Sequence, residues 1–184
     1  MTRLPYPGPA GDDSARDLEQ RISAERGEVL AIYRMLLHAP ALADGWRHLL
    51  TEVRHNAELS GRLREMVIMR IASLNGAVYE ADHHRPIALA EGVTNAQLER
   101  VAVRGSIGGD VLAGAHFTAA EIDVLTLTDS LTSHVQVDEK VFARLSERLG
   151  PRQTVELVVT IGAYNMVSRF LVALGIDAEP TAAR

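Results

Sequence analysis

The chain contains no cysteine among its 184 residues. This absence excludes disulfide bonds, catalysis by a thiolate and zinc sites with cysteine ligands. Lysine is almost as scarce, because Lys140 is the only one, and the arginines are spread along helical patterns rather than gathered in a run. Together with a formal net charge of −5, this distribution argues against a nucleic-acid-binding surface.

Aromatic residues and long apolar runs are also few. Aromatic residues make up 4% of the chain and hydrophobic residues 47%, so the core must be built from aliphatic side chains. The longest apolar runs, such as 155–163, are interrupted by Thr and Gly and are shorter than a membrane span requires. The N-terminal residues lack the apolar stretch of a signal peptide. We therefore expect no membrane partner and a cytoplasmic location.

Alternating strand patterns are scarce as well, and helical periodicity dominates from Asp12 onward. The length favours one domain that is large enough to bury its own core. We predict an all-α fold, with a Pro/Gly-rich N-terminal arm over residues 1–11 and a single helical domain over residues 12–184.

Caps and helix-breaking residues predict where the helices begin and end. The Asn75-Gly76 pair predicts a break between two helices. Four glycines within 105–114 predict a loop. Helix starts are expected near Asp44 for a helix to Asn56, at the capping boxes of Thr94 and Thr118, and at Pro151 for a final helix to about Leu174.

Three titratable residues have a spacing that a helical hairpin would bring together. Glu65 lies ten residues before Asn75, and His84 lies nine residues after it. At 1.5 Å of rise per residue, both lie about 15 Å from the turn, at matching heights if the two helices are antiparallel. Glu80 shares a helix face with His84 at i, i+4. Two carboxylates and an imidazole can transfer protons, so we interpret these three residues as candidate catalytic residues.

Simpler explanations exist for each of the three. Glu65 could be solvated or could pair with Arg62 or Arg64 in the first turns of its helix. Glu80 and His84 could form an ordinary pair on the helix surface, which contributes about 0.3–0.5 kcal/mol.

Neighbouring residues are candidates for contacts with a substrate. Adjacent helical residues point about 100° apart, so we expect His84 to face inward and His83, with Tyr79 on its side, to lie at the rim or on an interface. Asn165 interrupts an apolar stretch of the final helix, where a buried amide needs hydrogen-bond partners. It could cap a neighbouring helix or face a substrate.

A metal site is an alternative. Glu52-Val-Arg-His55 and Glu80-Ala-Asp-His83 both match the Glu-x-x-His pattern of di-iron helical bundles, and Glu65 would be a further carboxylate ligand. The motif is short, and a chain with 24 acidic residues and seven histidines contains it readily by chance. His55 could instead complement the dipole at a helix end.

The spacing also resembles that of a known family. The series Glu65, eleven residues, Ala77, two residues, Glu80, three residues, His84 has the spacing of the alkylhydroperoxidase D-like signature, Glu-x11-Cys-x2-Cys-x3-His. Residues 87–97 are similar to the segment that usually follows, and the resemblance covers most of residues 25–175. Both cysteine positions hold other residues, which excludes a peroxidase that cycles a dithiol. The chain is instead similar to the cysteine-free carboxymuconolactone decarboxylase branch.

The resemblance implies an all-α homo-oligomer, either a trimer or a hexamer, with a pocket near Glu65, Glu80 and His84. It also implies a lyase or isomerase that uses no cofactor and acts on a small carboxylated lactone or oxo-acid. His84 would donate a proton, Glu65 would orient it, and Glu80 would shuttle a proton or tune His84. Arg85 or Arg169 could bind the substrate carboxylate. A non-catalytic oligomer that binds a ligand is the second hypothesis.

Overall fold

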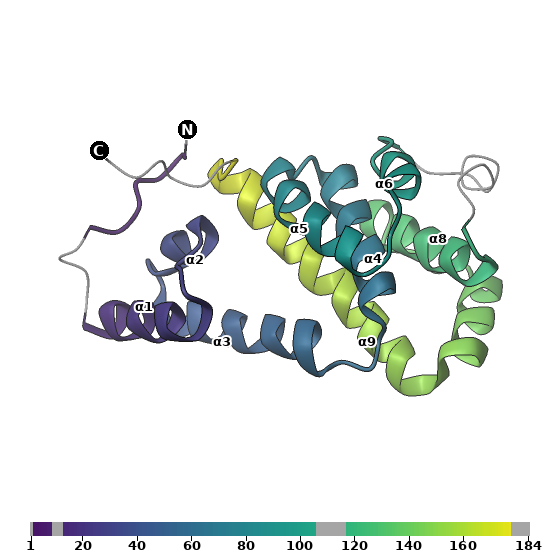
Figure 1. The fold of residues 1–184 in the computed structure, drawn as a ribbon, viewed down its shortest axis with the longest axis horizontal. Coiled ribbons are helices and arrows are strands. Elements are labelled where there is room, and N and C mark those ends of the chain that lie inside the picture. The colour runs from purple at the N-terminus through teal and green to yellow at the C-terminus, as the bar shows by residue number, and fades with distance from the viewer. Residues whose placement is uncertain (1, 9–12, 106–116, 178–184) are drawn as a thin grey trace.

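The computed structural model describes residues 2–8, 13–105 and 117–177 (Figure 1). Within these ranges every regular element is a helix, so the predicted all-α fold is confirmed. The elements in chain order are α1 (Asp13–Arg26), α2 (Ala31–Leu36), α3 (Pro40–Thr51), the π-helical turn η1 (Glu52–Asn56), α4 (Gly61–Asn75), α5 (Val78–Ala90), α6 (Asn95–Val101), α8 (Ala119–Ser133) and α9 (Glu139–Leu174).

The hairpin of α4 and α5 is defined by a cap at each end of α4. The Ser60 hydroxyl accepts a hydrogen bond from the backbone N–H of Leu63 and begins the helix. At the other end Gly76 adopts the left-handed conformation, with φ 68° and ψ 28°, which glycine tolerates without strain. The predicted break is confirmed, and α5 returns along α4 after two residues.

The other predicted helix starts are met, with one shift. Thr94 and Thr118 both form complete capping boxes. The helix expected near Asp44 begins at Pro40, because a proline is readily accommodated in the first turn of a helix. Its last turn, η1, is π-helical. The glycine-rich loop predicted over 105–114 lies, except for Gly105, outside the described residues.

The final helix contains a kink where the sequence predicted its start. Gly150 has non-helical angles, with φ 72° and ψ 169°, and Pro151 begins the second straight part of α9. By length and composition this helix could cross a membrane, which corrects the expectation that all apolar runs are too short. The runs were underestimated because Thr and Gly interrupt hydrophobicity without ending the helix. Half of the apolar window is buried in the structure.

Helix α4 lies at the centre of the molecule. It packs against α5, α6, α8 and α9, and its residues 65–72 are all buried. Figure 1 shows α9 crossing beneath the α4–α5 hairpin, with α1, α2 and α3 at one end and α6 and α8 at the other. The buried hydrophobic residues are mostly aliphatic, as the composition predicted.

A buried arginine also holds α4 in place. The Arg70 side chain is fully buried and donates to both carboxylate oxygens of Asp129 on α8, at 2.5 and 2.8 Å. The same guanidinium donates to the carbonyl oxygens of Val101 and Val103 at the end of α6. Because each buried charge is compensated, this pair fixes α6 and α8 against the central helix.

The N-terminal arm lies against the far end of α9. The Arg3 backbone N–H donates to the carbonyl oxygen of Leu174 at 2.8 Å, and the Arg3 guanidinium donates to those of Val172 and Ala173 at 2.5 and 2.6 Å. The arm therefore satisfies free carbonyl groups at the end of α9.

Candidate active site

A buried histidine lies between two carboxylates where α4 meets α5. His84 Nδ1 is 2.6 Å from Glu65 Oε2, and His84 Nε2 is 3.1 Å from Glu80 Oε1. The exposed fractions of the His84, Glu65 and Glu80 side chains are 6%, 0% and 8%. The hydrogen bond expected from the matching heights of Glu65 and His84 is present, so the structure brings all three residues together.

The carboxylates determine the protonation state of the histidine. Burial lowers the pKa of His84, but its hydrogen bonds to Glu65 and Glu80 outweigh burial and raise the pKa from 6.5 to about 9. Burial raises the pKa of Glu65, whereas hydrogen bonds from His84 and Arg64 hold that pKa below its usual value. At neutral pH, His84 is therefore an imidazolium that donates from both ring nitrogens, and Glu65 is a carboxylate.

Further contacts hold this group in position. Arg64 donates to Glu65 Oε1 at 3.1 Å and lies 3.6 Å from the Glu91 carboxylate, so the suggested pairing of Glu65 with Arg64 also occurs. The Tyr164 ring, from α9, meets the His84 ring edge-on with their centroids 5.3 Å apart. Burial raises the pKa of the Tyr164 phenol, so that this hydroxyl stays neutral. Residues from three helices therefore fix the imidazole.

Glu80 and His84 line a cavity of about 230 Å³, which we call the His84 cavity. Its apolar wall consists of Leu30, Ile32, Trp46, Leu50, Ile87 and Val167. Its polar wall consists of Glu28, Tyr33, Arg54, Tyr79, Glu80, His83, His84 and Tyr164. Glu65 is not part of the lining and lies behind His84. Apolar walls with a few polar groups are typical of sites for small organic molecules.

Tyr79 and His83 lie together on this cavity. Their rings stack with centroids 4.2 Å apart, and His83 Nδ1 lies 3.0 Å from the Tyr79 carbonyl oxygen. His83 is half-buried whereas His84 is buried, in agreement with the inward and rim positions expected from the sequence. A contact of either residue with a substrate stays a prediction.

Asn165 and Arg169 lie elsewhere. The buried Asn165 amide donates to the Thr132 hydroxyl at 2.9 Å, and its oxygen accepts from Asn75 at 3.0 Å and from Arg169 at 2.8 Å. Neither residue lines the His84 cavity. Their polar groups join α9 to α8 and to the end of α4, so this placement favours the helix-capping alternative over a substrate contact. Sequence reasoning could not separate the two because both require a buried amide.

The two Glu-x-x-His motifs do not converge. Glu52 accepts a hydrogen bond from Asn56 at 2.9 Å, while Glu80 is bound to His84 rather than grouped with His83. Within residues 2–8, 13–105 and 117–177, no group of three or more acidic or histidine residues could hold a metal ion.

Sequence reasoning missed most of the cavity wall, including Arg54, Trp46 and Tyr164. Arg54 belongs to the π-helical turn η1, and the wider turn changes its direction in a way that ordinary helical periodicity does not predict. Trp46 and Tyr164 occur in apolar helical patterns that also describe a simple core. The available signal for Tyr164 was its neighbour Asn165, because a polar interruption of an apolar stretch marks that turn of the helix.

Comparison with known proteins agrees with this geometry. Residues 40–126, which contain Glu65, Glu80 and His84, match the model of the Carboxymuconolactone decarboxylase family. This segment of the chain is similar to the carboxymuconolactone decarboxylase family. No curated protein matches the chain by sequence.

Solved structures share this fold over nearly the whole chain. An uncharacterized peroxidase-related protein from Silicibacter sp. TM1040 is 15% identical with a TM-score of 0.77, covering 98% of this chain and 92% of that one. A second, described as an alkylhydroperoxidase AhpD core from Ralstonia eutropha JMP134, is 17% identical with a TM-score of 0.75, covering 96% and 91%. The debrominase Bmp8, in complex with 2,3,4-tribromopyrrole, is 16% identical with a TM-score of 0.68, covering 99% and 93%.

Proposed function

We propose that the protein is a lyase or isomerase that needs no cofactor and transfers a proton to or from a small carboxylated lactone or oxo-acid. The observation that carries this proposal is His84, held as a buried imidazolium between Glu65 and Glu80 at the wall of the His84 cavity. A buried histidine with both nitrogens on carboxylates is costly to maintain for packing alone. Such perturbed groups in a cavity are typical of acid–base catalysis.

The reaction begins with the substrate carboxylate. The carbon–carbon bond to this group breaks, carbon dioxide leaves, and the electron pair is delocalised into the neighbouring unsaturated carbonyl system. The resulting enolate is protonated at carbon by a general acid. A proton from His84 balances the step, and solvent restores it through the cavity.

The hydrogen bonds decide the direction in which the proton travels. Glu65 is fully buried behind Nδ1, and its lowered pKa keeps it ionised, so it fixes the tautomer rather than taking the proton. Nε2 is the nitrogen on the Glu80 side, and Glu80 lines the cavity. The proton therefore leaves from Nε2, and Glu80 relays it or moves aside for the substrate.

The structural similarity to a debrominase supports a substrate of the size of a small ring compound. Bmp8 holds 2,3,4-tribromopyrrole in its complex, and a pyrrole ring is similar in size to a five-membered lactone. The His84 cavity, at about 230 Å³, has room for a ring of this size. Dehalogenation itself is not part of the proposal.

An activity screen tests the proposal. Purified protein is incubated with a panel of carboxylated lactones and oxo-acids, and carbon dioxide release or isomer formation is followed for the wild type and for His84→Gln. We expect turnover of at least one compound and a loss of about a hundredfold or more in the variant, the usual size of a general acid–base contribution. Turnover that survives in His84→Gln contradicts the assignment.

Ligand binding without turnover is the second candidate, and the His84 cavity itself favours it. Ligand binding without turnover predicts that compounds bind to both the wild type and His84→Gln and are recovered unchanged, whereas a lyase or isomerase would convert them. A homo-oligomeric assembly and a cytoplasmic location accompany both proposals.

A further inference from the structure

The proposed reaction requires a cation for the substrate carboxylate, and neither arginine suggested by the sequence lines the His84 cavity. Arg85 is exposed and donates to Asn95 at 2.8 Å, while Arg169 donates to Asn165. A different arginine, Arg54, is part of the cavity wall.

Arg54 differs from the other cations near the relay because no acidic residue neutralises it. Arg64 is paired with Glu65 and Glu91. In contrast, the Arg54 side chain forms no hydrogen bond or ion pair with any residue of the described ranges 2–8, 13–105 and 117–177. Its side chain is half-buried, so part of its hydration is lost without compensation. An uncompensated guanidinium in a cavity is a site for an anion.

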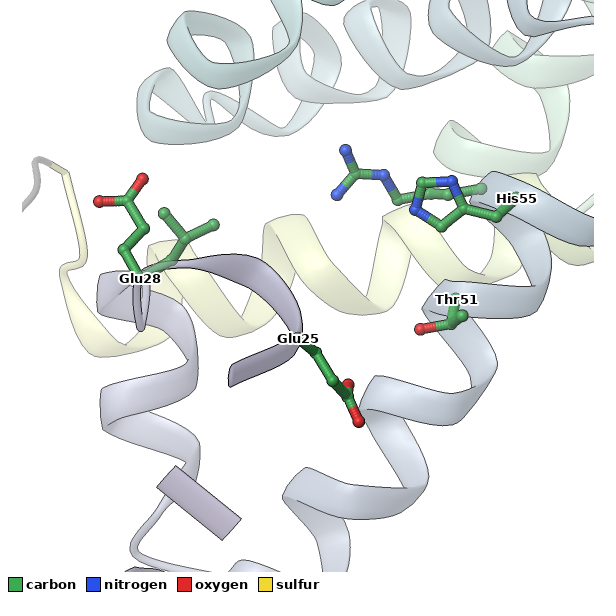
Figure 2. A pocket seen from close by; sticks show the side chains of 6 residues that line it. Glu25, Glu28, Thr51 and His55 are labelled. Carbon is green, nitrogen blue, oxygen red and sulfur yellow. The ribbon is translucent and has the colours of Figure 1, made fainter. Parts of the chain in front are cut away.

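Arg54 can also be reached from solvent. It lines not only the His84 cavity but also a hollow of about 330 Å³ between α3 and the α1–α2 connection. Figure 2 shows this hollow, with Glu25 and Glu28 on one side and Thr51 and His55 on the other. Arg54 therefore lies where an entering ligand would pass on its way to the relay.

The nearby acidic groups do not cancel this cation. The Glu80 carboxylate lies 3.1 Å from the His84 imidazolium, which compensates its charge. Glu28 is exposed, so water and salt screen its charge. Of the remaining acidic residues that line hollows with Arg54, Glu25 pairs with Arg47, Glu58 with Arg152, and Glu65 and Glu91 with Arg64, so the Arg54 guanidinium is left to pair with a ligand carboxylate.

We infer that Arg54 is the carboxylate-binding residue of the His84 cavity, and that the ligand is a small organic acid. This assignment deepens the proposed function by naming the group that recognises the substrate. It concerns binding, however, and so is testable without turnover.

The only tryptophan of the chain lies in this wall and reports on the ligand directly. The probe is 5-oxotetrahydrofuran-2-carboxylate, a carboxylated lactone, and the neutral comparison is its methyl ester. Titration followed by Trp46 fluorescence gives the Kd of each compound for the wild type, Arg54→Gln, Arg54→Lys and Arg85→Gln. Arg85→Gln removes the same charge outside the cavity and is the matched control.

We expect the wild type to bind the acid more tightly than the ester. Arg54→Gln should weaken binding of the acid about 10- to 100-fold, the effect of losing one charge-assisted hydrogen bond, with little change for the ester. Arg54→Lys should lie between the two, because lysine keeps the charge but not the planar fork. Arg85→Gln should bind as the wild type does. Circular dichroism checks that each variant keeps its helices.

Three results would overturn the assignment. The wild type could bind the acid and the ester with equal affinity, or Arg54→Gln and Arg85→Gln could lose the same affinity for the acid. The third is that the acid shows no saturable binding at millimolar concentration. The outcome is separable from that of the proposed function. If binding depends on Arg54 but no compound is turned over, the proposed lyase is refuted and the assignment of Arg54 stands. If turnover depends on His84 but not on Arg54, the proposed lyase stands and the assignment of Arg54 is refuted.

Discussion

At the scale of single residues, the site is defined by how four charged side chains compensate one another. The imidazolium of His84 neutralises one of its two carboxylates, and Arg64 adds a positive charge behind Glu65. The arrangement holds the proton tightly at neutral pH, because the pKa of His84 is raised to about 9. A substrate that brings a developing negative charge next to Nε2 is then what releases the proton.

The pH dependence of stability tests this protonation state. The pKa of His84 is about 9 in the folded chain against 6.5 for an unperturbed histidine, so folding favours the protonated form. The stabilisation is fully present below about pH 6.5 and is lost as the pH rises through about 9. We expect the urea midpoint of the wild type to fall across this window and that of His84→Gln to change less. Identical pH profiles for the two proteins would contradict the raised pKa.

The missing cysteines allow a second prediction at this scale. Neither Ala77 nor Glu80, which occupy the cysteine positions of the AhpD-like signature, can form a sulfenic acid or a disulfide. We expect no peroxide consumption coupled to a dithiol reductant, measured on metal-free protein. Turnover that survives metal removal would refute this expectation.

At the scale of the elements, the α4–α5 hairpin was the part most accessible from the sequence. Asn75-Gly76 fixes the turn, and equal distances from that turn place Glu65 beside His84. The same reasoning could not find Arg54, since its direction depends on the π-helical turn and not on a residue count. It also could not decide the role of Asn165, because the partners of a buried amide come from distant elements.

Two glycine substitutions test the role of this turn. Gly76 has φ 68°, and a Cβ there would meet no atom within 4 Å, so Gly76→Ala adds only backbone strain and should cost about 1–2 kcal/mol. Gly45 lies inside α3 with equally open space and no positive φ, so Gly45→Ala should instead stabilise by about 0.5–1 kcal/mol. Urea unfolding measures both, and effects of the same sign would contradict this account of the turn.

At the scale of the whole molecule, one face of α9 is apolar and exposed. Val155, Val159 and Met166, at i, i+4 and i+11, are 62%, 40% and 38% exposed. Large exposed apolar patches are often covered in an assembly. This face, rather than the N-terminal arm, is the feature that fits the proposed homo-oligomer.

Light scattering tests the assembly. We expect a mass that is a multiple of the 20.0 kDa chain at micromolar concentration. Val159→Glu should lower that mass, because it places a charge in the covered face. Val137→Glu, at a residue 42% exposed before α9, should leave it unchanged. A wild-type protein that is monomeric at this concentration would remove the proposal.

The contact between the arm and α9 joins distant parts of the chain, so it can form only late in synthesis. The hydrogen bond of Arg3 to Val172 joins residues 169 positions apart, so at 5–20 residues per second its acceptor follows roughly ten to thirty seconds after its donor. The pairing of Glu65 with His84 spans only 19 residues and can form far earlier on the ribosome. Glu65 and His84 can therefore pair before Tyr164 and Val167, which come later in the chain, close the cavity.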